Sequence, residues 1–169
     1  MANPMYGQNK SDTAIENSKV AVKKPTVRGA DIANDTNALS LASWGAVYDC
    51  LLTTNAKAIA VPSTTDADVG KQIVINFVAA IAAGGDPTFT LGSGDVFSQA
   101  SYQNGTGVTE FHPPLTTDNT FSIEGEGTNG GVAVTSSFTM TVLAKGSVLL
   151  EANWVHKGTG SAAAAWTTV

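Results

Sequence analysis

The sequence predicts an all-β protein, with a single jelly-roll-like or two-sheet β-sandwich domain that follows an extended N-terminal arm. Apolar and polar residues alternate with period two in several segments, as in strands that bury one face. Clusters of Gly, Pro, Asn and Asp interrupt these segments about every eight to twelve residues, which is typical of sandwiches. No segment has a convincing pattern for a long helix. The chain of 169 residues suffices for one hydrophobic core.

The first segment, residues 1–28, is basic and poor in large apolar residues, so we expect an extended arm. It contains five positive side chains and two negative ones, Asp12 and Glu16, which gives a net charge of +3. The whole chain carries −5, which leaves −8 for the remainder. Residues 29–38 are polar and are expected to connect the arm to the body. The five positive residues are Lys10, Lys19, Lys23, Lys24 and Arg28.

Residues 39–157 are predicted to form the sandwich body. Residues 39–50 alternate, with Trp44 and Tyr48 on the same face, and predict the first strand. A second strand is expected at 57–61, before Pro62. A turn at 66–70 then leads into 71–78, where Ile73, Ile75 and Phe77 share one face. This last pattern indicates a core strand.

The second half of the body predicts further short strands separated by turns. Residues 138–142 and 148–154 alternate clearly, and Trp154 is expected to point into the core. Residues 158–169 are rich in small side chains and are expected to form a loose C-terminal tail. The other expected strands are at 88–91, 96–97 and 121–123, and turn signals stand at 84–87, 92–95 and 104–105.

No set of residues has the pattern of a catalytic or metal site. A Ser-His-carboxylate triad would need His112 or His156, and no Gly-x-Ser-x-Gly motif is present. Asp66 and Asp68 resemble the start of a calcium loop, but its downstream ligands are missing. We therefore expect no catalytic residue, no metal and no cofactor.

The pair Glu124 and Glu126 leaves a glycan hydrolase as a minor alternative, because such enzymes use two carboxylates. Glycines around the pair favour a loop instead. Cys50 is the single cysteine, which excludes an intrachain disulfide and suits synthesis in reducing cytosol. No apolar run approaches the ~20 residues that span a bilayer, so we expect no membrane partner.

The arm favours a protein partner over nucleic acid. Its positive charges are dispersed, and Tyr6 alone offers an aromatic ring for stacking on bases. An acidic protein surface matches the charge better. Lysines that are only solvated on a tether are the simpler alternative.

The sequence also resembles a known class of proteins. The opening Met1-Ala2-Asn3-Pro4-Met5-Tyr6-Gly7-Gln8-Asn9-Lys10 is similar to the start of small virion structural proteins of tailed phages that infect marine bacteria, cyanophages in particular. The body is similar in pattern to small β-domains of phage head-decoration and fibre proteins, whereas residues 30–58 are unmatched. The matching motifs include Ile59-Ala60-Val61-Pro62, Asp68-Val69-Gly70-Lys71, Ile73-Val74-Ile75-Asn76-Phe77, Thr88-Phe89-Thr90-Leu91, Asp95-Val96-Phe97 and Leu149-Leu150-Glu151-Ala152-Asn153-Trp154.

This resemblance implies a capsid decoration, or cement, protein on the virion exterior that grips the major capsid protein with its arm. Such proteins often self-associate as trimers, and the sequence leaves a monomer and a trimer open. Trp44 and Trp166 are expected at contacts between subunits. The alternative is a fibre or tail-associated domain that binds a host-surface glycan through loops in residues 92–109. The expected capsid-binding residues of the arm are Pro4, Met5, Tyr6, Ile15, Val20, Val22, Lys23, Lys24, Val27 and Arg28.

Overall fold

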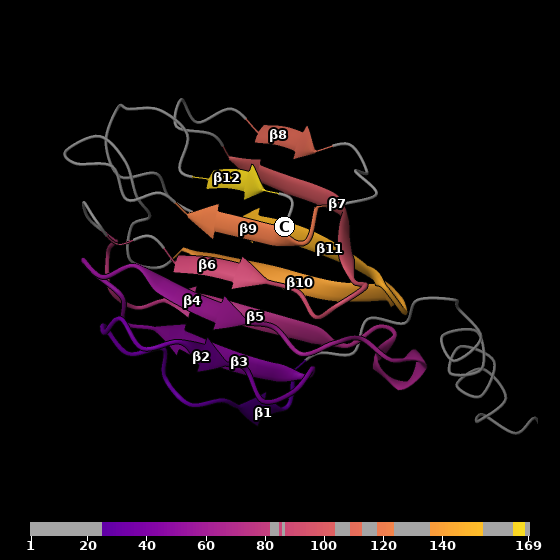
Figure 1. Cartoon of the computed structure of the whole chain (residues 1–169), viewed down its shortest axis with the longest axis horizontal. Helices are drawn as coiled ribbons and strands as arrows, with labels where there is room; N and C mark the ends of the chain where they lie inside the picture. Colours follow the sequence, from indigo (N-terminus) through magenta and orange to yellow (C-terminus); the bar gives the residue numbers. More distant parts are fainter. Residues whose placement is uncertain are drawn as a thin grey trace, which may run out of the picture.

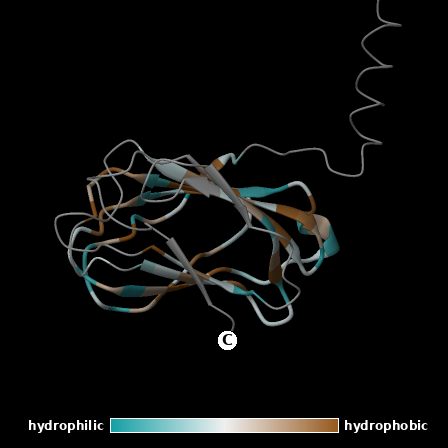
Figure 2. Cartoon of the chain, turned by 90° about the horizontal axis from the view of Figure 1, so that it is seen from above, coloured by the Kyte–Doolittle hydropathy of each residue, from teal (hydrophilic) through white to brown (hydrophobic). Residues whose placement is uncertain are grey.

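The protein forms two β-sheets that lie face to face (Figure 1, Figure 2). The structure, a computed structural model, describes residues 25–81, 85, 87–103, 109–112, 118–123, 136–153 and 164–167. Across these ranges the chain is almost entirely strand and turn. The prediction of an all-β two-sheet sandwich is confirmed.

One sheet has seven strands among the described residues, in the order β1-β3-β5-β10-β11-β7-β8. The other has five, in the order β12-β9-β6-β4-β2. The larger sheet contains β1 (Val27–Arg28), β3 (Ala46–Cys50), β5 (Gln72–Phe77), β10 (Ser137–Ala144), β11 (Ser147–Asn153), β7 (Val96–Gln103) and β8 (Thr109–His112). The smaller contains β12 (Ala164–Thr167), β9 (Thr120–Ile123), β6 (Pro87–Thr90), β4 (Lys57–Ala60) and β2 (Leu39–Ser40), and the 3-10 helix η1 (Asp66–Asp68) precedes β5.

From β1 to β6 the chain alternates between the two sheets, one strand at a time. Neighbours within each sheet therefore run in parallel: β1 with β3, β3 with β5, β2 with β4, and β4 with β6. Among the described strands, five of ten pairings are parallel, the fifth being β7 with β11. Jelly rolls are antiparallel, so the jelly-roll alternative is not confirmed.

The core fills the space between the sheets with alternate residues of strands such as β3, β4, β5 and β6. Phe138 of β10 lies at its centre, against aromatic rings from both layers. Its ring centroid is 6.0 Å from that of Phe77, 4.8 Å from Phe89 and 5.7 Å from Phe121. All four rings are at most 1% exposed. The alternation that predicted the strands at 71–78 and 138–142 therefore identified the buried faces correctly.

Three boundaries differ from the sequence prediction. Residues 39–50 form two strands, because the chain turns before β3 and Gly45 adopts a φ of 95°, which a residue with a side chain rarely adopts. The body begins before residue 39: β1 lies within the predicted arm, and Ile32 bridges to Cys50. Finally, β12 forms within the predicted loose tail and pairs with β9.

Candidate functional site

The most distinctive polar feature of the described residues is a row across the outer face of the seven-stranded sheet. Asp49 of β3 pairs in register with Asn76 of β5, and Asn76 pairs with Ser137 of β10. The residues next to them in sequence, such as Phe77 and Phe138, point into the core. Because side chains alternate along a strand, Asp49, Asn76 and Ser137 face outward side by side.

Arg28 of β1 completes this row at the edge of the sheet. Its guanidinium donates a hydrogen bond to the carboxylate of Asp49, and Asn76 donates its side-chain N–H to the other oxygen of Asp49 at 3.3 Å. The bond from Arg28 lowers the pKa of Asp49 below its ordinary value, and the same contact raises the pKa of Arg28. The Asp49 side chain is only 17% exposed, so the sheet holds it in place.

Gly29 explains how β1 packs closely enough to place Arg28. The Gly29 N–H donates to the carbonyl of Val47 at 2.8 Å, and the ring of Tyr48 lies directly against the glycine. A Cβ at position 29 would be 2.0 Å from the Tyr48 ring, so only glycine fits. The Tyr48 hydroxyl is fixed in turn by the N–H of Ala42, at 3.0 Å.

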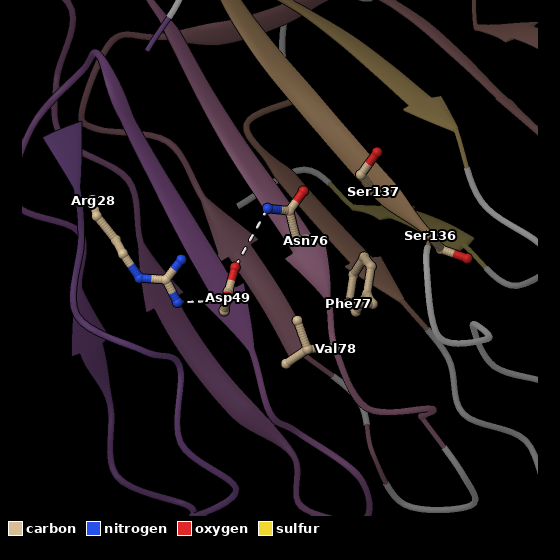
Figure 3. Close-up of a pocket in the computed structure, with 7 residues that line it drawn as sticks. All are labelled: Arg28, Asp49, Asn76, Phe77, Val78, Ser136 and Ser137. Carbon is tan, nitrogen blue, oxygen red and sulfur yellow. Dashed lines mark hydrogen bonds and ion pairs between the residues drawn. The ribbon is translucent and has the colours of Figure 1, made fainter. Parts of the chain in front are cut away.

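An open pocket of about 510 Å³ lies beside this row (Figure 3). Its polar lining comes from the four strands β1, β3, β5 and β10 and from Ser136, which precedes β10. Val78 contributes an apolar side chain that is 43% exposed. The pocket is lined by Arg28, Asp49, Asn76, Phe77, Val78, Ser136 and Ser137. It combines hydrogen-bonding groups with one apolar wall.

Two other polar clusters of the described residues are structural. The buried side chain of Lys57 donates to the carboxylate of Asp35 at 2.5 Å and to the carbonyl of Ala33 at 3.3 Å. Asp95, also buried, accepts hydrogen bonds from the backbone N–H and the hydroxyl of Thr64 at 2.7 and 2.8 Å. Both clusters tie loops to the sheets, because their charged groups are satisfied by nearby backbone and side chains.

Cys50 is buried in the core, and this burial raises its pKa to about 11. A thiol with so high a pKa is almost entirely protonated at neutral pH and therefore a poor nucleophile. The Cys50 side chain therefore contributes to packing of the core.

In the described part of the chain, no group of three or more His, Cys, Asp and Glu side chains is placed to hold a metal ion. Nor does that part contain a helix long and apolar enough to cross a membrane.

The structure places the sequence-predicted residues as follows. Val27 and Arg28, expected at the end of the capsid-binding arm, form β1 and pair with β3 of their own chain. Trp44, expected at a contact between subunits, is instead in the core: it is 6% exposed and its indole N–H donates to the Pro62 carbonyl at 3.0 Å. Trp166 lies in β12, opposite Phe121 of β9.

Most residues of the predicted arm lie outside the described residues, and their expected role stays a prediction. The same holds for the expected core residue Trp154, the acidic pair Glu124 and Glu126, and His156. The arm residues concerned are Pro4, Met5, Tyr6, Ile15, Val20, Val22, Lys23 and Lys24.

Asp66 and Asp68 belong to the short helix η1, where Asp68 accepts bonds from the N–H and hydroxyl of Thr65 and pairs with Lys71 at 2.7 Å. Asp68 therefore serves as a cap of this turn. Sequence reasoning missed the row Asp49, Asn76 and Ser137. Their polarity at outward strand positions is visible in the sequence, but their register is not.

Comparisons with known proteins add no family to this description. No protein-family model, curated protein or solved structure matches the chain.

The paired aspartates predict how stability depends on pH. The pKa of Asp35 is lowered by its hydrogen bond from Lys57, and that of Asp49 by its bond from Arg28. A carboxyl group whose pKa is lower in the folded state stabilises the fold above its unfolded pKa, and this contribution is lost as the pH falls. We expect the melting temperature to fall progressively below about pH 5. Thermal unfolding followed by circular dichroism measures this.

The double variant Asp35→Asn and Asp49→Asn serves as the comparison. Its melting temperature should be lower at neutral pH and should change less between about pH 5 and pH 2. An equally steep acid dependence in the double variant would show that other groups cause it.

Proposed function

We propose that this protein is a capsid decoration protein of a bacteriophage, which binds the major capsid protein on the head exterior through its N-terminal segment. The observation that carries this proposal is the position of β1. The strand lies at the outer edge of the seven-stranded sheet, and Val27 is 56% exposed there. Among the described strands β1 has no neighbour on its outer side, so an extended segment 1–24 could reach a neighbouring protein from this edge.

The contacts of β1 support a firm attachment at this point. Thr26 and Gly29 donate backbone hydrogen bonds to Gly45 and Val47, at 3.0 and 2.8 Å. The ion pair of Arg28 and Asp49 crosses the same two strands. Any force on the N-terminal segment would consequently pass into the sheet through these bonds.

Charge supports a protein partner with an acidic surface. Residues 1–24 carry four lysines against Asp12 and Glu16, a net charge of +2 in a chain of net −5. Ordering such a segment costs conformational entropy, which its contacts on the capsid must exceed. Many symmetry-related copies on a capsid would together make individually weak contacts durable.

Deletion of residues 1–24 tests the proposal while it retains β1. The full chain should sediment with empty phage heads assembled without it, and the truncated chain should remain in the supernatant. The truncated body should keep its melting temperature, because Val27 and Arg28 still pair with β3. A truncation at residue 28 would be ambiguous, since it also removes a strand of the sheet.

Co-sedimentation of the truncated chain at the level of the full chain would contradict the proposal. Attachment through the body, as in a fibre or tail protein, would then be the better explanation.

A further inference from the structure

The pocket beside the polar row has the chemical character of a ligand site. Ligand pockets combine apolar contact with a few well-placed polar groups. Here the apolar side is the exposed side chain of Val78. The polar side is the row from Arg28 to Ser137 (Figure 3).

The charges of the lining favour an uncharged ligand. Among the described residues that line the pocket, Arg28 and Asp49 are the only ionised side chains, and they pair with each other. Arg28 also contacts Asp31 at 3.4 Å. A bound anion would have to compete with two carboxylates for the guanidinium, and a bound cation would compete with Arg28 for Asp49. Neither class of ion gains a free partner.

Two polar groups of the pocket lining are free to form hydrogen bonds with a ligand. Among the described residues, the Ser137 hydroxyl and the Asn76 side-chain carbonyl have no partner, and both lie at the pocket. The hydroxyl can donate and accept, and the carbonyl can accept. Neighbouring strands are about 4.8 Å apart, so the row from Asp49 to Ser137 offers such groups over about 10 Å.

We propose that this pocket binds a neutral carbohydrate. Sugar hydroxyls both donate and accept, which matches the Asn76 amide, the Ser137 hydroxyl and the remaining lone pairs of Asp49. The C–H face of a sugar ring fits against Val78. The site lies on the body and uses none of residues 1–24. It is independent of the proposed capsid attachment and would give an attached protein a second, outward function.

Amide chemical shifts of the full chain, titrated with millimolar sugars, test this inference. The probes are glucose, galactose, mannose and N-acetylglucosamine, together with their oligosaccharides. At least one should shift the amides of residues 28, 49, 76–78 and 136–137 in a saturable manner. Asn76→Ala and Ser137→Ala should each weaken that binding about tenfold, because each removes a hydrogen bond to the ligand.

Thr139→Ala is the matched control: Thr139 lies on the same outer face of β10, two residues beyond Ser137, and does not line the pocket. It should leave the affinity unchanged. Glucosamine and glucuronate serve as charged probes and should bind more weakly than the neutral sugars. The proposal is overturned if no neutral sugar shifts these amides, if the charged sugars bind better, or if Thr139→Ala weakens binding as much as Ser137→Ala. Head binding by the pocket variants should be normal, so a failure here is distinct from a failure of the deletion experiment.

Discussion

Replacing Phe138 by alanine is expected to lower the free energy of unfolding by about 3–5 kcal/mol. The Phe138 side chain is fully buried and contacts Phe77 from its own sheet and Phe89 and Phe121 from the other. Its removal leaves a cavity between the two sheets. Backbone hydrogen bonds between strands hold each sheet in place, so the sheets cannot close over the cavity. Urea unfolding followed by circular dichroism measures the loss.

Val78→Ala is the control for this prediction, because the Val78 side chain is exposed and lies outside the core. It should cost less than about 1 kcal/mol. A loss below about 1 kcal/mol for Phe138→Ala would mean that the two sheets do not depend on this aromatic contact.

Replacing Thr64 by valine should cost about 2–4 kcal/mol, although the two side chains have nearly the same shape. The Thr64 hydroxyl donates to the buried carboxylate of Asp95 at 2.8 Å and accepts from the N–H of Gly146 at 2.7 Å. Valine would leave a buried charge with one fewer donor and a backbone N–H without its acceptor. Both losses carry a desolvation cost.

The matched control is Thr139→Val, in which the lost hydroxyl is half-buried on the outer face and has no hydrogen bond among the described residues. It should change the free energy of unfolding by about 0.5 kcal/mol or less. If urea unfolding gave Thr64→Val and Thr139→Val equal stabilities, the cluster around Asp95 would not be a stabilising element.

Local patterns in the sequence predicted most strands of the core and their buried faces, because period-two alternation reports directly which side chains leave water, but they did not predict β1, β8 or β12. It placed Trp44 on the same face as Tyr48, and both are buried. The parallel pairing was not predictable in this way. Alternation defines the face of a strand but says nothing about which strand lies beside it or in which direction.

The site was harder to predict than the fold for the same reason. Asp49, Asn76 and Ser137 come from three strands far apart in the chain, and only their register makes them neighbours. Trp44 was expected at a contact between subunits and lies in the core instead; residue type alone does not separate the two places, because large aromatic residues are common in both. The bond from its indole to Pro62 is a tertiary contact that no local pattern reports.

The alternation of β1 to β6 between layers has a consequence for how the molecule comes apart. Each successive strand crosses to the opposite layer, so the two layers are joined by every connection from β1 to β6. Loss of structure that proceeds along the chain from its N-terminal end would release strands of the two layers in turn, β1 first and then β2. A partner that binds this end would therefore slow the unfolding of both layers.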